Sequence, residues 1–307
     1  MSHWFLNKKH FSPINKAFYP YLKNDMLVLV DGGAAGELSE PFNVSPDIIK
    51  SVRFEPRGKE VVNTNNNEIF IDAGIWSSDC IQKLHLAKVP TTSSVCPPDM
   101  KYLSKFDETN VGVRRTEKIL EIQMRSIDSC ILKNEMPIAD FIKLDVHSAE
   151  LPALKGALGN IQNCLGLLVE TWHSPVHINQ GLHFEIEKFA IDHGFEVYDL
   201  VCAARWKHKF ENDVDYFERG QYIGSEILFI KKDILKDKIL KKAFILCLFG
   251  FANEAKFILQ GHDDENIKTN LINSILEFQK RRKKSIKLIL KMIAFKLLNI
   301  FSFLNNL

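Results

Sequence analysis

Two acidic residues and two histidines follow two short apolar segments in the middle of the chain. Asp145 and His147 come after the segment that ends at Leu144, and Glu170 and His173 come after the next one. If both segments are parallel strands of one sheet, their carboxyl ends meet at the edge where such sheets bind ligands. A carboxylate or an imidazole there could remove a proton from a hydroxyl group. We therefore predict Asp145 and His147 as catalytic residues, and Glu170 and His173 as substrate-binding residues.

The same residues leave other interpretations open. A metal held by Asp145 and Glu170 is conceivable, but their spacing indicates no particular ion, and we predict no metal site. His147 could instead be a solvent-facing residue at the start of a helix. His177 and His183 follow in the same region, and we expect them on loops or on the surface.

A glycine-rich loop, Asp31–Gly36, follows the apolar run Leu27–Val30. Glycines allow a backbone to approach a ligand closely, and the helix that we expect behind them would offer free N–H groups. In such folds an acidic residue after the second strand binds ribose hydroxyls, and Glu55 fits that position. The predicted cofactor-binding residues are Asp31, Gly33, Ala34, Gly36 and Glu55. The alternative is that the loop is only a turn.

Asp31 discriminates between two cofactor classes. A nicotinamide dinucleotide would place its diphosphate over the loop, where a carboxylate repels it. A cationic ligand, such as the sulfonium of S-adenosylmethionine, is favoured by the same charge. We therefore predict S-adenosylmethionine as the cofactor and disfavour a nicotinamide oxidoreductase.

Short apolar runs that alternate with helix-like stretches must position these residues. Continuous Val/Ile/Leu/Phe runs are typical of strands covered on both faces, and alternation with helices predicts a mostly parallel sheet. The predicted strands are Leu27–Val30, Ser51–Phe54, Glu68–Ile71, Phe141–Leu144, Leu165–Val169, Phe195–Leu200 and Ile227–Lys231. Helices are predicted from Ser148 to Leu158 and over Phe184–His193, ending at Gly194. The sequence thus predicts a doubly wound α/β sheet of about seven strands.

Two regions depart from this alternation. Ile81–Ser129 contains three prolines and two alternating segments, which predicts a β-hairpin insertion near the binding site. After Lys232 we expect helices over Ile234–Gln260 and Ile267–Lys280, followed by a basic, apolar stretch.

Composition limits the class of protein. The chain has 307 residues, of which 46% are hydrophobic, and a formal net charge of +2. This predicts a folded protein without the broad basic face of a nucleic-acid binder. Six scattered cysteines form no C-x-x-C pair, which favours reduced thiols in the cytosol. The N-terminus lacks the continuous apolar core of a signal peptide, so we expect a cytoplasmic protein.

An ordered set of motifs over about two thirds of the chain, from Leu27 to Lys231, resembles the FkbM-type methyltransferase family. The motifs are Val30–Gly36, Arg53–Pro56, Thr92–Ser94, Asp140–Asp145, Ala149–Leu151, Leu154–Ala157, Gly194–Phe195 and Arg219–Gln221. The resemblance implies a class I methyltransferase sheet, S-adenosylmethionine as cofactor, and an oxygen acceptor, often on a sugar or natural product. It also implies that Gly74 lies near the adenine and that Asp145 faces the reacting centre.

The resemblance divides the chain into an N-terminal segment, 1–25, a methyltransferase domain, 26–232, and a helical extension, 233–307. His147 and Ser148 depart from the family, which usually has Glu or Gln followed by Gly there, and Glu226 replaces a more usual Asp. These departures leave two hypotheses. The chain O-methylates a saccharide or glycolipid precursor in polysaccharide biosynthesis, or it is a catalytically reduced binding module with the same fold.

The C-terminal stretch 281–304 combines Ile, Leu and Phe with a stripe of lysines at helical spacing. The lysines interrupt the run too often for a membrane span. A helix lying on an anionic membrane surface fits this pattern, and the alternative is a helix packed on the body or on a second copy of the chain. A peripheral position on the inner face of the membrane would make a lipid-linked glycan a plausible acceptor.

Overall fold

The protein is described by a computed structural model that covers residues 8–57, 67–210, 219–233 and 235–281. The chain forms two compact units. Within the described residues, the first comprises those between 23 and 233, and the second comprises 8–22 together with 235–281.

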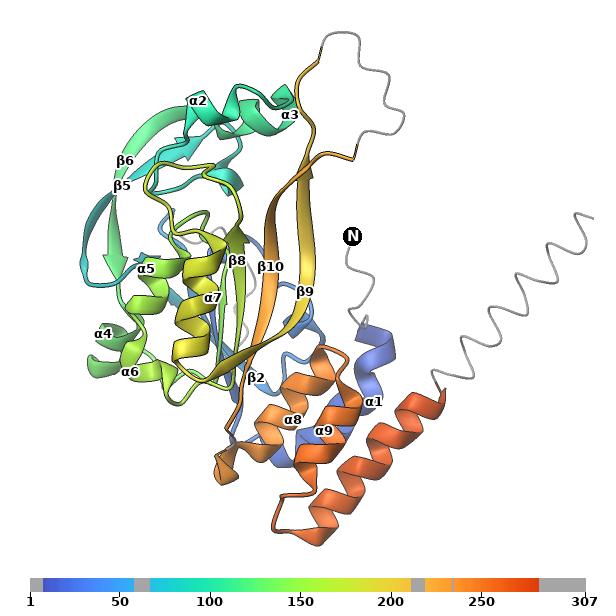
Figure 1. Ribbon diagram of the computed structural model, residues 1–307. Coiled ribbons are helices and arrows are strands. Elements are labelled where there is room, and N and C mark those ends of the chain that lie inside the picture. The colour runs from blue at the N-terminus through green and yellow to red at the C-terminus, as the bar shows by residue number, and fades with distance from the viewer. Residues whose placement is uncertain (1–7, 58–66, 211–218, 234, 282–307) are drawn as a thin grey trace, which may run out of the picture. The chain divides into compact units, whose positions relative to one another are not determined.

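The first unit contains a seven-stranded sheet with the order β3-β2-β1-β7-β8-β10-β9 (Figure 1). Its strands are β1 (Leu27–Gly32), β2 (Ile49–Phe54), β3 (Glu68–Ile71), β7 (Phe141–Leu144), β8 (Gly166–Trp172), β9 (Phe195–Trp206) and β10 (Gln221–Lys231). The pairings among the first five strands of that order are parallel, and β10 is antiparallel to both β8 and β9. The predicted doubly wound α/β sheet is confirmed.

Helices cover one face of this sheet. α5 (Glu150–Lys155) and α7 (His183–Asp192) both contact β8. Their apolar side chains join those of the central strands in one buried cluster. The stretch predicted as one helix to Leu158 is interrupted at Gly156, and α6 (Leu158–Ile161) follows. A Cβ at position 156 would lie 2.0 Å from the carbonyl oxygen of Trp76, so only glycine fits between the two helices.

The predicted hairpin insertion is present. β5 (Cys80–Ala87) pairs antiparallel with β6 (Thr116–Arg125), and with β4 (Gly74–Ile75) they form a second, three-stranded sheet. The connection between β5 and β6 holds the short helices η2 (Pro90–Thr92), α2 (Met100–Leu103), α3 (Glu108–Val111) and η3 (Gly112–Arg114). After β6, α4 (Ile127–Leu132) leads back to β7.

The second unit is helical. It contains α1 (Lys8–Leu22), η4 (Lys236–Lys238), α8 (Ile239–Leu248), α9 (Ala252–Leu259) and a helix over 265–281. One helix was predicted over Ile234–Gln260, but Gly250, with a φ of +89°, separates α8 from α9. Phe244 of α8 packs against Phe11 and Phe18 of α1, with ring centroids 6.0 and 5.4 Å apart.

The membrane-surface helix predicted over 281–304 lies, apart from Arg281, outside the described residues. Within the described part of the chain, every helix is too short or too polar to traverse a lipid bilayer.

Candidate active site

A cavity of about 450 Å³ lies at the carboxyl ends of β1, β2 and β7. Gly33 follows β1, Glu55 follows β2, and Asp145 and His147 follow β7, and all four line the cavity. Leu84, Ile122 and Met124 of the hairpin insertion, together with its segment 90–95, form another wall. In the sheet, β1 is followed by its neighbour β2 in one direction, and β7 is followed by its neighbour β8 in the other. Ligands of such folds bind in the crevice where the strand order reverses in this way.

Gly33 allows the loops after β1 and β7 to approach each other. Its φ is +80°, and a Cβ there would lie 2.0 Å from the backbone oxygen of Asp145. Gly36 also has a positive φ, +85°, but no atom lies within 4 Å of its Cβ position. Gly74 lines the cavity, where a Cβ would lie 2.6 Å from Sδ of Met124. Ala34 and Gly36 line an adjoining cavity that shares Glu55 with the first.

The helix predicted behind the glycine loop is absent. Residues 33–41 are irregular, and the next element is the single turn η1 (Phe42–Val44). The amides of Gly33 and Ala34 both donate to the carbonyl oxygen of Phe54, and the amide of Ala35 donates to that of Gly33. Since these three donors are engaged and no helix begins here, the loop does not present the N–H groups of a helix start that bind a diphosphate.

Asp31 lies below the loop and does not line the cavity. Its carboxylate is 2% exposed, and its oxygens lie 3.2 Å from Nζ of Lys143 and 3.9 Å from Nε of Arg53. Both cations come from the residues paired with Asp31 on the neighbouring strands. The prediction that a free Asp31 carboxylate selects a cationic cofactor is therefore wrong in its premise, because the charge is neutralised by its partners. Arg53 in turn donates to the carbonyl oxygens of Ala34 and Gly36, so the pair holds the loop.

Glu55 lines both cavities, but Arg57 already contacts its carboxylate. The Nε and Nη2 atoms of Arg57 lie 2.7 and 2.8 Å from the two carboxylate oxygens, and its backbone N–H donates to one of them at 3.0 Å. A ribose hydroxyl would share or displace this contact. Arg57 lines the cavity too, and the only signal for it in the sequence is its place two residues after the predicted ribose-binding acid.

The loop after β7 has an unusual backbone. His147 and Ser148 have φ values of +48° and +84°, a region that disfavours residues with a Cβ. Glu150, which is buried, accepts hydrogen bonds from the backbone N–H groups of Val146 and Ser148 at 3.1 and 3.2 Å. Ser94 of the insertion donates to the carbonyl oxygen of His147. These contacts hold the side chain of His147 toward Glu170.

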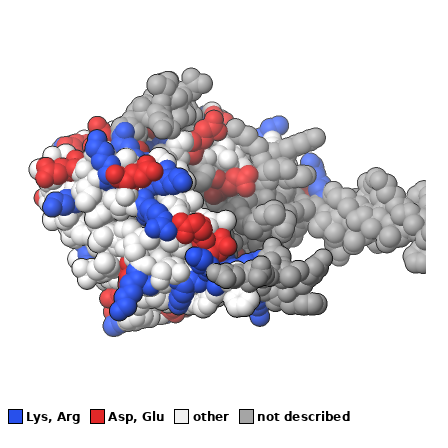
Figure 2. Space-filling model, turned by 90° about the horizontal axis from the view of Figure 1, so that it is seen from above, with Lys and Arg blue, Asp and Glu red and all other residues white. Residues whose placement is uncertain are grey.

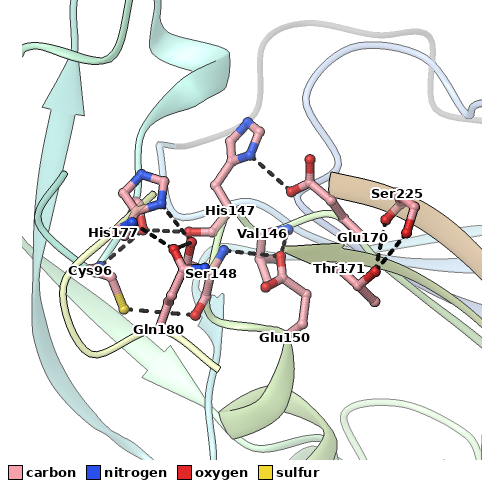
Figure 3. Close-up of polar contacts among 11 residues, drawn as sticks. Cys96, Val146, His147, Ser148, Glu150, Glu170, Thr171, His177, Gln180 and Ser225 are labelled. Atoms are coloured by element: carbon pink, nitrogen blue, oxygen red, sulfur yellow. Dashed lines mark hydrogen bonds and ion pairs between the residues drawn. The ribbon is translucent and has the colours of Figure 1, made fainter. Parts of the chain in front are cut away.

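A second, buried set of contacts holds Ser148. Its Oγ lies 2.6 Å from Nδ1 of His177 and 3.3 Å from Oε1 of Gln180, and its carbonyl oxygen accepts from the thiol of Cys96 at 3.7 Å (Figure 3). His177 lies on a loop, between β8 and α7, as one of the two predicted alternatives had it, but it is buried, at 2% exposure, and not on the surface. Burial, together with the nearby charges of His147 and Arg114, lowers the pKa of His177 to about 3, and it is neutral at pH 7.

The structure brings Asp145, His147 and Glu170 together. One ligand atom from each lies within 4.8 Å of the others, and Nδ1 of His147 is 3.0 Å from Oε2 of Glu170. Burial lowers the pKa of His147, but the charges of Glu170, Asp145 and Glu150 outweigh it and raise this pKa to about 9. In the ligand-free protein, His147 therefore carries a proton at pH 7.

Glu226 adds a further carboxylate to this edge. It lies directly opposite Glu170 in the antiparallel pairing of β10 with β8. Burial, together with the charges of Asp145, Glu170 and Asp31, raises the pKa of Glu226 to about 7, although Lys143 opposes this shift.

His173, the other predicted substrate-binding residue, lies away from the cavity lining. Its ring stacks on that of His183, with centroids 4.1 Å apart, and lies 4.5 Å from that of Tyr222. Its Nε2 is 3.0 Å from Oγ of Ser225. His173 thus belongs to a neighbouring aromatic group rather than to the cluster of Asp145, His147 and Glu170.

Comparisons with known proteins give one family match and two structural likenesses. Residues 45–197 match the model of the methyltransferase FkbM domain. A methyltransferase FkbM from Methylobacillus flagellatus is similar in structure at 15% identity and a TM-score of 0.37, over 67% of this chain and 44% of that one. A Streptococcus agalactiae protein of the NADB-Rossmann superfamily has 13% identity and a TM-score of 0.25, over 87% of this chain and 95% of its own.

The chain thus spans less than half the length of the Methylobacillus protein. No curated protein matches it.

Proposed function

Because this chain belongs to the FkbM methyltransferase family through residues 45–197, we propose that it transfers the methyl group of S-adenosylmethionine to a hydroxyl group. The observation that carries the proposal is the cavity after β1, β2 and β7, which Gly33, Glu55, Gly74, Asp145 and His147 line. Its volume of about 450 Å³ falls in the range of small-molecule sites, roughly 300–1,000 Å³.

The charges at this edge suit the sulfonium cofactor. Asp145 lines the cavity, whereas Glu170 does not line it but has a carboxylate oxygen within 4.8 Å of one of Asp145, and Glu226 lies opposite Glu170. This surplus of carboxylates attracts a positively charged sulfur and repels a diphosphate. The sequence assigned the preference for a cationic cofactor to Asp31. We propose that this preference comes from Asp145 and Glu170 instead.

Methyl transfer needs the acceptor oxygen in line with the methyl group and free of its proton. The oxygen forms a bond to the methyl carbon while the carbon–sulfur bond breaks, and the electron pair stays on the sulfur of S-adenosylhomocysteine. We propose that Asp145 and His147 face the acceptor and take up its proton. A neighbouring sulfonium lowers the pKa of His147, which favours the neutral imidazole that can accept a proton.

The acceptor that we propose is a hydroxyl of a saccharide or glycolipid precursor. The family resemblance supports an oxygen acceptor, and the basic, apolar sequence of 281–304 supports a site of action at the inner face of an anionic membrane. Comparison of surface glycans by mass spectrometry, from cells with and without the gene, tests this. A difference of one methyl group is expected, and identical glycans would contradict the saccharide assignment.

Calorimetric titration with S-adenosylhomocysteine and with NAD tests the cofactor. We expect the chain to bind S-adenosylhomocysteine and not NAD. Glu55→Gln should bind S-adenosylhomocysteine at least tenfold more weakly. Glu117→Gln, which changes an exposed carboxylate on β6, is the matched control and should bind like the wild type. Uptake of NAD without S-adenosylhomocysteine would overturn the proposal.

A catalytically reduced binding module is the second candidate. The contact of Arg57 with Glu55 and the presence of His147 and Ser148 in the loop after β7 favour it. Asp145→Asn separates the two candidates. If the chain is an enzyme, this variant should lose methyl transfer to a glycan fraction and keep cofactor binding. A wild-type protein that binds the cofactor and methylates no glycan would favour the binding module.

A further inference from the structure

Three side chains of metal-ligand type meet at the ends of β7 and β8. Asp145, His147 and Glu170 each offer one ligand atom, and these atoms all lie within 4.8 Å of one another. In an octahedral site with bonds of about 2.1 Å, adjacent ligand atoms are about 3.0 Å apart and opposite ones about 4.2 Å. The 3.0 Å between Nδ1 of His147 and Oε2 of Glu170 equals the spacing of adjacent ligands. In the ligand-free protein this contact is a hydrogen bond, and an ion bound by both atoms would replace the proton that they share.

The loop that carries His147 is fixed independently of any ligand. Its left-handed backbone is held by Glu150 from below and by Ser94 from the insertion. Figure 3 shows the imidazole directed at the carboxylate of Glu170, which comes from the next strand. A site whose ligands are positioned before the ion arrives loses less entropy on binding.

The charge around these groups calls for a cation. Within the described residues, no lysine or arginine forms an ion pair with Asp145, Glu170 or Glu226. Lys143 lies on β7, two residues before Asp145, and its Nζ forms its ion pair with Asp31, at 3.2 Å. The Glu226 carboxylate lies opposite Glu170 and has no hydrogen bond in the described part of the chain. It is a further carboxylate at this edge for which the described residues show no ion pair.

We propose that Asp145, His147 and Glu170 bind one divalent transition-metal ion of the Mn²⁺ type. One imidazole with two carboxylates suits Mn²⁺, Fe²⁺, Co²⁺ or Zn²⁺, whereas Mg²⁺ and Ca²⁺ prefer oxygen ligands throughout. Three protein ligands leave coordination positions open for a further molecule. Metal binding releases the proton of His147, because only the neutral imidazole is a ligand.

The consequence for the reaction rests on the proposed function. An acceptor hydroxyl that fills an open position is made more acidic by the ion. With the ion in place, Asp145, His147 and Glu170 would hold it, and the proton of the acceptor hydroxyl would pass to water instead of to His147 before the oxygen bonds to the methyl carbon and the carbon–sulfur bond breaks.

Titration of the chelator-treated full chain with Mn²⁺, followed by calorimetry and by the electron paramagnetic resonance of free Mn²⁺, tests the proposal without cofactor or acceptor. We expect one ion per chain, and at least tenfold weaker binding after Glu170→Gln or His147→Ala. Glu187→Gln is the matched control, because Oε2 of Glu187 pairs with Nε2 of His183 at 2.9 Å but belongs to no group of three ligands. It should bind Mn²⁺ like the wild type. Circular dichroism checks that each variant is folded.

No Mn²⁺ binding by the wild type would overturn the proposal, as would unchanged binding in both folded ligand variants. Tighter binding of Mg²⁺ or Ca²⁺ than of Mn²⁺ would overturn the ion class. S-adenosylhomocysteine is titrated into the same samples. If the chain binds S-adenosylhomocysteine and does not bind Mn²⁺, only the metal site is refuted. If it binds Mn²⁺ and does not bind S-adenosylhomocysteine, only the proposed function is refuted.

Discussion

The hydroxyl oxygen of Ser148 lies 2.6 Å from Nδ1 of His177, and both residues are buried, at 1% and 2% exposure. This pair connects the loop after β7, which carries the reactive groups, to the segment that follows β8. It also holds Ser148 in a backbone conformation, φ +84°, that residues with a Cβ rarely adopt.

Ser148→Ala and Ser148→Gly separate the two contributions of this residue. Both variants lose the hydroxyl, which leaves His177 with a weaker set of partners and costs about 1–3 kcal/mol. Only the glycine variant also relieves the strain of the positive φ, by about 1 kcal/mol. Ser148→Gly should therefore be the more stable of the two in urea unfolding. Equal free energies of unfolding would show that the loop is not held in this conformation.

Gly33→Ala should prevent the loops after β1 and β7 from meeting, because its Cβ would lie 2.0 Å from the backbone oxygen of Asp145. We expect a loss of several kcal/mol in the free energy of unfolding, and loss of S-adenosylhomocysteine binding. Gly36→Ala is the control, with the same sign of φ and open space around the Cβ, and should cost only about 1–2 kcal/mol. Thermal unfolding and calorimetry measure both. A Gly33→Ala variant as stable as Gly36→Ala would contradict this packing.

Asp31→Asn should reduce stability because it leaves the buried Lys143 without its carboxylate partner, whereas Arg53 keeps Glu68, 3.4 Å away. Removing one partner of a buried ion pair costs about 3–5 kcal/mol. Asp192→Asn removes the carboxylate of the exposed pair with Lys188 and should cost less than about 1 kcal/mol. Chemical unfolding compares the two variants. If Asp31→Asn retained full stability and lost cofactor binding, Asp31 would act on the ligand directly.

The pKa of His147 is measured by the NMR titration of its ring protons in the metal-free, ligand-free protein. Burial lowers this pKa and the charges of Glu170, Asp145 and Glu150 raise it, with a result of about 9. After Glu170→Gln it should fall toward or below the ordinary value of about 6.5, because burial remains and the first partner charge is gone. His177, with a pKa of about 3, should stay neutral over the same range and serves as the internal reference.

The same shift predicts the direction of a stability change. A folded-state pKa above the unfolded value means that the stabilisation from protonated His147 is complete below about pH 6.5. It is lost as the pH rises through about 9. The wild type should therefore lose more stability than Glu170→Gln between pH 7 and 9.5. Parallel curves would show that Glu170 does not hold the proton on His147.

The sequence by itself predicted the seven strands and the hairpin insertion, because period and composition report which faces of a segment are buried. It also predicted which segments end beside the site, since parallel strands place their carboxyl ends at one edge. Gly33, Glu55, Asp145 and His147 were named in this way, Gly74 was named from the family resemblance, and all five line the cavity. Their roles remain predictions.

Only the tertiary structure decided what surrounds each of these groups. The charge of Asp31 could not be judged from the chain, because its partners Arg53 and Lys143 lie 22 and 112 residues away and meet it only through strand pairing. His177 likewise contacts Ser148 across 29 residues. A local pattern records the type of a side chain, whereas its protonation, pairing and exposure depend on neighbours that folding brings from distant parts of the sequence.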